Sequence, residues 1–188
     1  MAKISSKKTD DLPDLRDLFV THLKAMLDIE EQLTKALPKM AEAATDKELK
    51  MAFTDHLEET ETHVERIKSI FASLDEKPDT VECGAVRGLV KDAEWFIKKI
   101  KVGTVRDAAL IAAANDVEHY EIATYSTAIE WATELGYDDV RESLEMTLSE
   151  EENAADIVMS LGRNRLNEEA LGDDENTESA ESDDDSGE

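Results

Sequence analysis

The chain has 188 residues, with only three prolines, seven glycines and a formal net charge of −25. That charge argues against nucleic-acid backbones and anionic membranes as partners, and no apolar stretch approaches the roughly 20 residues that span a bilayer. The single cysteine, Cys83, excludes an intramolecular disulfide and favours a reducing compartment. Because "MAKISSKKTDD" is not a signal peptide, we expect a cytoplasmic protein of helical composition.

Two long helices are predicted before the first break in the pattern. Residues 1–11 are polar and are expected to form a flexible N-terminus. The first helix is expected over 12–44, where apolar residues recur at helical spacing. In "TDKE", Glu48 follows Thr45 by three residues, which indicates a capping box. The second helix therefore starts there and is expected to extend to about Leu74.

Two further long helices follow a crossover. "DEKPDTVECG" breaks the helical pattern, and a shorter amphipathic helix is expected over 84–100. The third long helix is expected over 105–135, ended by Gly136 in "ELGYDD", and the fourth over 138–166. Residues 168–188 hold eleven acidic residues and no Lys or Arg, and are expected to form a disordered tail.

These elements predict an all-α fold made of two helical hairpins and a long connection. A connection of that length can cross from one end of a bundle to the other, as it does in ferritin-like folds. Four helices of about 28 to 32 residues would each span roughly 45 Å. We therefore expect residues 12–167 to form one ferritin-like four-helix bundle, with a long crossover that carries a short extra helix.

Two carboxylates fall on the apolar side of the third long helix. At about 100° per residue, Glu118 lies within roughly 20° to 40° of Ile122 and Tyr125. Glu121 lies on the same side as Val117, about 60° from Glu118. Both are therefore expected to point into the bundle.

The first and fourth long helices show the same feature. Glu30 is aligned with the apolar row of the first helix, and Glu151 with that of the fourth. Glu152, with Asp156 one turn further on, remains an alternative ligand from the fourth helix. Long side chains can also turn outward from the flank of a helix, so a single Glu in an apolar row is weak support for a site.

The second helix offers a carboxylate and an imidazole. Glu59 and His63 are four residues apart, so they can reach one ligand together. Two other histidines, His56 and His119, are expected to pack near the site rather than bind a ligand.

All of these candidates lie near the middle of their helices, and antiparallel pairing brings them to one level. A buried carboxylate without a partner costs several kcal/mol, and several together repel unless a multivalent cation lies between them. Oxygen-rich sites with one or two imidazoles suit iron or manganese, and inward Glu residues from four helices build ferritin-like di-metal sites. The pattern therefore predicts a metal centre.

Four blocks, "IEEQLTKALPKMAEAA", "HLEETETHVERI", "VEHYEIATY" and "EEENAAD", closely resemble the YciE/YciF-type ferritin-like stress proteins and occur in the same order. The resemblance covers about 12–166, including the crossover "CGAVRGLVKDAEWFI". It implies a bundle that is usually dimeric and has a di-iron site, in a family described as ferroxidases or stress-response proteins. By position, it implies as metal ligands Glu30, Glu59, His63, Glu118, Glu121 and Glu151.

The chain also departs from the usual di-iron pattern, which has Glu-x-x-His on two helices. The second helix has Glu59-x-x-x-His63 instead, and the fourth has no histidine. The expected function is oxidation of Fe(II) by oxygen or peroxide with two Fe per chain; manganese or a single metal is the alternative cofactor. The other function left open is a non-enzymatic stress-response or interaction protein. The acidic composition fits either cation attraction or, as we expect, a salt-adapted source.

Overall fold

The computed structural model describes residues 12–172 of the chain. The elements are α1 (Leu15–Ala43), α2 (Lys47–Ser73), α3 (Gly84–Lys99), α4 (Thr104–Glu134), α5 (Asp138–Leu161), a π-helical turn η1 (Gly162–Leu166) and α6 (Asn167–Gly172). No β-strand occurs within 12–172, so the predicted all-α class is confirmed. The predicted N-terminus 1–11 and residues 173–188 of the predicted tail lie outside the described residues, whereas the first residues of that tail belong to α6.

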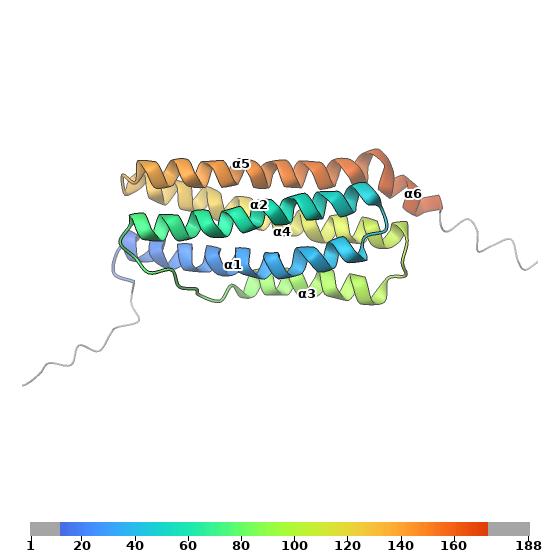
Figure 1. The fold of residues 1–188 in the computed structure, drawn as a ribbon, viewed down its shortest axis with the longest axis horizontal. Helices are drawn as coiled ribbons and strands as arrows, with labels where there is room; N and C mark the ends of the chain where they lie inside the picture. The colour runs from blue at the N-terminus through green and yellow to red at the C-terminus, as the bar shows by residue number, and fades with distance from the viewer. Residues whose placement is uncertain (1–11, 173–188) are drawn as a thin grey trace, which may run out of the picture.

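The four long helices α1, α2, α4 and α5 lie side by side as a bundle, and α3 runs along one half of it (Figure 1). α3 packs against α1 and α4. The connection that precedes α3 is held on α1, where Val81 N–H donates to Lys24 O at 3.2 Å and Cys83 N–H donates to Asp28 Oδ2 at 2.7 Å. The predicted ferritin-like bundle, with a crossover that carries a short helix, is therefore confirmed.

The start of α2 differs from the predicted capping box. The cap is Asp46, whose side chain accepts from the backbone N–H groups of Glu48 and Leu49, both at 3.0 Å. Thr45 does not cap the helix; its backbone N–H donates to Asp107 Oδ1 at 2.8 Å. Asp46 N–H donates to the other oxygen of Asp107 at 2.9 Å, so a carboxylate of α4 fixes the turn between α1 and α2.

The end of α4 follows the prediction. Gly136 has φ of 71°, a left-handed conformation that glycine adopts without strain. Gly136 N–H donates to Thr133 O at 3.1 Å and Tyr137 N–H to Ala132 O at 2.9 Å, which is the pattern of a Schellman motif. The chain therefore reverses sharply between α4 and α5.

The fourth long helix does not continue regularly to residue 166. α5 ends at Leu161 and the chain widens into the π-helical turn. A Cβ atom at Gly162 would lie 3.4 Å from Ile111 Cγ2, an ordinary contact distance, so the turn packs directly against α4. Leu166, at the end of the turn, is fully buried.

The core consists of two apolar clusters separated by a polar layer. One cluster, in the half that α3 covers, includes Phe53 and Leu110; the other, in the opposite half, includes Phe19 and Leu144. Between them, at the middle of the four long helices, lie the buried polar residues Glu30, His56, Thr60, His63, Glu118, Glu121, Thr124, Thr147 and Glu151. The fold therefore places a set of ionisable groups where a bundle normally has apolar side chains.

Candidate metal centre

Each of the four long helices contributes ionisable side chains to this polar layer. Helical periodicity explains why they share one level: each residue occupies the core-facing row of its helix, near the middle of its length. The contributors are Glu30 from α1, His56 and His63 from α2, Glu118 and Glu121 from α4, and Glu151 from α5.

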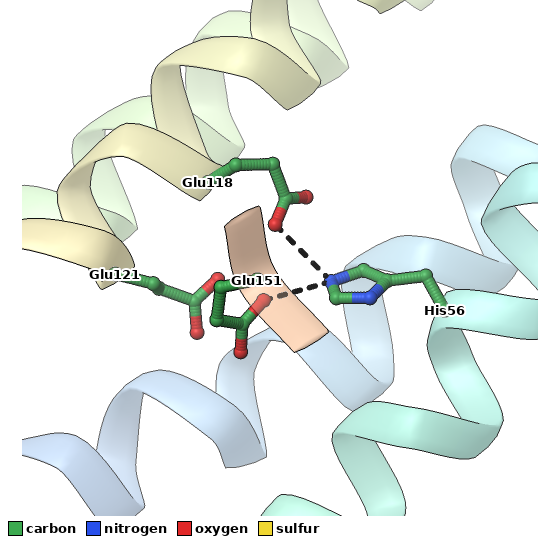
Figure 2. Close-up of side chains that lie close together, drawn as sticks. All are labelled: His56, Glu118, Glu121 and Glu151. Atoms are coloured by element: carbon green, nitrogen blue, oxygen red, sulfur yellow. Dashed lines mark ion pairs between the residues drawn. The ribbon is translucent and has the colours of Figure 1, made fainter. Parts of the chain in front are cut away.

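The first ligand group combines His56, Glu118, Glu121 and Glu151, all buried, with one ligand atom from each lying within 4.8 Å of the others. His56 Nε2 is 3.4 Å from Glu118 Oε2 and 3.5 Å from Glu151 Oε2. Figure 2 shows the three carboxylates and the imidazole pointing toward one another from α2, α4 and α5. Three oxygen ligands and one nitrogen ligand are a donor set that suits iron or manganese.

The second ligand group combines Glu30, His63 and Glu151. His63 Nδ1 lies 2.9 Å from Glu151 Oε1 and 3.6 Å from Glu30 Oε2. The Tyr125 hydroxyl donates a hydrogen bond to the other oxygen of Glu30. Glu151 belongs to both groups, so the two groups are adjacent and one carboxylate can serve two cations.

Each histidine of the centre is oriented by a carboxylate on its outer side. His56 Nδ1 lies 3.2 Å from Glu59 Oε2, and His63 Nε2 lies 2.9 Å from Glu150 Oε2. Arg66 in turn binds Glu150, with 2.7 Å between Nη1 and Oε2. A carboxylate that accepts the outer ring N–H fixes the imidazole tautomer and leaves the inner nitrogen as a ligand.

Most of the inward-facing donor atoms have no hydrogen-bond partner. Within residues 12–172, nine buried side-chain nitrogen and oxygen atoms are unpartnered, and seven of them belong to the centre: Glu30 Oε2, His63 Nδ1, Glu118 Oε2, and both oxygens of Glu121 and Glu151. A buried carboxylate oxygen without a partner is costly, so a bound cation or a proton must compensate. Glu151 Oε1, which lies 2.9 Å from His63 Nδ1, is within reach of a proton on that ring.

The pKa values of Glu118 and Glu121 are shifted in the direction expected for crowded, buried acids. Burial raises the pKa of Glu118, His56 opposes the shift and Glu151 adds to it, giving about 8. Burial, Glu151 and Glu30 together raise the pKa of Glu121 well above its ordinary value. Without a cation, these side chains therefore hold protons that an ordinary surface Glu has lost at neutral pH.

The pKa values of the two histidines are shifted upward, the opposite of what burial alone would cause. Burial lowers the pKa of His56, but Glu118 and Glu59 outweigh it and raise the value to about 9. Burial likewise lowers the pKa of His63, and Glu151 and Glu30 raise it to about 10. Both imidazoles must lose a proton before they can bind a metal.

The charges of the residues fit two divalent cations. Four carboxylates, on Glu30, Glu118, Glu121 and Glu151, carry four negative charges when ionised, and two neutral imidazoles add nitrogen donors. Two divalent ions neutralise this set and provide the partners that the unpartnered oxygens lack. The donor chemistry and the unpartnered atoms therefore both suit a two-metal centre.

Glu59 is the predicted ligand that the structure does not place in the centre. Its side chain is 40% exposed and reaches only the outer nitrogen of His56. It lies about 60° around α2 from His56, so it occupies the flank of the helix rather than its core-facing row. The other five predicted ligands, Glu30, His63, Glu118, Glu121 and Glu151, do lie in the two groups.

His56 is the ligand candidate that sequence reasoning missed. It was expected to pack near the site, yet its Nε2 faces Glu118 and Glu151. Its spacing from His63 could have identified it, because seven residues are two helical turns and place both rings in one row. His119 is exposed, so the expectation that it packs near the site was wrong.

Burial distinguishes the alternative ligand candidates on α5. Glu151 is fully buried, whereas Glu152 and Asp156 are exposed. Glu150 was not among the predicted candidates; it contacts the outer nitrogen of His63 and forms an ion pair with Arg66.

The fold and this polar layer together define an all-α bundle protein with buried groups that can bind metal. Residues 14–171 match the family described as Domain of unknown function (DUF892), and the chain belongs to that family. It is 41% identical over 162 residues to Protein YciF of Escherichia coli strain K12. The aligned region covers 85% of this chain and 97% of Protein YciF. The predicted kinship with YciF-type proteins is thus confirmed.

Solved structures give the same result. YcfI from Rhodopseudomonas palustris matches with a TM-score of 0.79 and 43% identity, over 81% of this chain and 97% of the other. The E. coli stress protein YciF matches with a TM-score of 0.79 and 40% identity, over 82% and 98%. A protein from Xanthomonas campestris shares the fold at 18% identity, with a TM-score of 0.68 over 85% of this chain and 98% of the other.

None of the helices within 12–172 has the length and apolarity needed to cross a membrane.

Proposed function

We propose that the protein binds two Fe(II) ions as substrate in the polar layer and oxidises them to Fe(III), with oxygen or peroxide as the electron acceptor. The observation that supports this most strongly is the convergence of seven unpartnered donor atoms from the four long helices. One ion would be held by His56, Glu118, Glu121 and Glu151, and the other by Glu30, His63 and Glu151.

The residues of the layer would favour the loss of an electron from each ion. Anionic oxygen donors stabilise Fe(III) more than Fe(II), which lowers the reduction potential. Glu59 and Glu150 hold the outer nitrogens of His56 and His63, so the inner nitrogens stay directed at the centre. The two apolar clusters on either side limit the access of water.

The electrons and protons of the reaction balance for either acceptor. Two Fe(II) ions lose one electron each, and one O₂ takes up these two electrons and two protons to leave as H₂O₂. With peroxide as acceptor, the same two electrons and two protons convert H₂O₂ into two water molecules. Removal of free Fe(II) limits oxidative damage, and the E. coli relative is described as a stress protein, so we place this reaction in a stress response.

The test compares two adjacent residues of α5. Glu151→Gln removes the carboxylate that both ligand groups share, whereas Glu152→Gln makes the same chemical change on an exposed side chain. Protein loaded with Fe(II) under anaerobic conditions is exposed to oxygen, and oxygen consumption and Fe(III) absorbance are followed. We expect the parent and Glu152→Gln to react and Glu151→Gln to lose the reaction. Equal turnover in all three proteins would refute the proposal.

A non-enzymatic stress-response protein is the second candidate, and the histidine pKa values favour it. With His56 near 9 and His63 near 10, both imidazoles are positively charged at neutral pH and can neutralise part of the layer without a metal. This alternative predicts that anaerobic incubation with Fe(II) or Mn(II) leaves no metal on the protein and does not change its thermal stability. Uptake of two Fe(II) ions per chain at this layer, followed by their oxidation, would exclude it.

A further inference from the structure

A small, largely enclosed cavity lies beside the metal centre, on the side that α3 covers. Its volume is about 10 Å³. α1, α3 and α4 provide an apolar wall that includes Leu37, Ala93 and Ala114, and the polar end of the cavity is formed by His56 and Glu118. The cavity therefore connects an apolar space directly to two residues of the first ligand group.

We propose that this cavity is the docking site for molecular oxygen, beside the His56 and Glu118 face of the centre; the assignment rests on the proposed oxidation of Fe(II). Apolar cavities in proteins stay dry and take up apolar molecules. Eight of the ten lining residues are apolar, so the wall away from His56 and Glu118 offers no hydrogen bond to water or peroxide. Peroxide would leave two O–H donors unpaired over most of the wall, whereas oxygen has none to pair.

The polar end of the cavity is shared with the metal centre. Glu118 is 3% exposed and its Oε2 has no hydrogen-bond partner. This atom also lies 3.4 Å from His56 Nε2, so it belongs to the centre while its residue lines the cavity. A molecule in the cavity would therefore be next to a cation that these two residues hold.

The crossover helix α3 closes the cavity from outside. Within α3 only Val86 and Ala93 are buried, and Ala93 is one of the lining residues. Alanines from three different helices, Ala36 of α1, Ala93 of α3 and Ala114 of α4, leave the space that larger core residues would fill. The short extra helix of the crossover thus shields an apolar space next to the centre.

The test fills the cavity without changing a metal ligand. Ala114→Leu and Ala93→Leu each place a larger side chain in the wall, and Ala112→Leu makes the same change at an exposed position of α4. Metal-free crystals pressurised with krypton report the gas site directly. We expect krypton in the cavity of the parent and of Ala112→Leu, and none in the filled variants.

Kinetics with the two acceptors provide the second readout. In the filled variants the KM for oxygen is expected to rise roughly tenfold, while Fe(II) stoichiometry and peroxide-driven oxidation stay at the parent level. Circular dichroism selects the variants that keep the fold.

Absence of krypton from the parent cavity, or an unchanged KM for oxygen in both filled variants, would overturn the assignment. A parent that binds krypton here but does not oxidise Fe(II) would refute the proposed function and the assignment to oxygen with it.

Discussion

The Glu118→Gln variant is expected to be more stable than the parent when no metal is bound. Burial raises the pKa of Glu118, His56 opposes this and Glu151 adds to it, so the folded value is about 8 against an ordinary 4.5. Because the folded pKa is the higher one, folding takes up a proton at pH 7, which costs about 3 kcal/mol. A neutral amide avoids that cost, but it also removes the negative charge that Glu118 places beside His56. A net gain of about 1 to 3 kcal/mol remains, or roughly 3 to 10 °C in Tm for a chain of this size.

Thermal unfolding followed by circular dichroism measures this difference. Glu152→Gln is the matched control, because Glu152 is exposed on α5 and its loss should leave Tm unchanged. The advantage of Glu118→Gln should shrink as the pH falls from 7 toward 4, where the unfolded chain also holds the proton. Saturating Mn(II) should reverse the order, since a neutral amide is a poorer cation ligand. A metal-free Glu118→Gln variant that is less stable than the parent at pH 7 would refute this reasoning.

Three further results are expected. Zn(II) binding at pH 7 should release protons, because His56 and His63, with pKa values of about 9 and about 10, are charged before they bind metal; calorimetry that gives equal enthalpies in buffers of different ionisation enthalpy would contradict this. Both folded values lie above the ordinary 6.5, so their stabilisation is complete below pH 6.5 and is lost as the pH rises through 9 and 10. The Tm of the metal-free protein should therefore fall over that range, and a flat profile would count against it. Glu59→Gln and Glu150→Gln should weaken metal binding roughly 10- to 100-fold, because each removes the partner of a ligand histidine. Glu58→Gln, on the exposed side of α2, is the control for competition titrations, and the idea fails if all three variants match the parent.

The all-α fold and much of the centre were predictable because helices have a fixed period. Rotation about each helix axis places Glu30, Glu118 and Glu151 in core-facing rows, and the structure has them buried there. Antiparallel pairing of the two hairpins then brings the middles of the helices to one level, so no knowledge of side-chain contacts is needed to predict that these residues meet. The boundaries of α3 and α4 were also predicted within a residue or two, since Gly and Pro mark them.

Features that depend on contacts between distant residues were not predictable. Glu59 and His63 are close in sequence, but only the packing of α5 against α2 shows that Glu150 and Glu151 occupy the space around His63. The turn before α2 depends on Asp107, which lies 62 residues from Thr45 in the sequence. Local capping rules cannot include such a partner, and so the predicted capping box was wrong.

Metal loading of the native chain tests the central claim most directly. Protein stripped of metal is incubated with Fe(II) without oxygen, the bound iron is counted, and its positions are located by anomalous scattering in crystals. We predict two iron ions per chain, one among His56, Glu118, Glu121 and Glu151 and the other among Glu30, His63 and Glu151. Protein that retains no iron, or iron bound only outside the polar layer, would contradict the assignment of this layer as a metal centre.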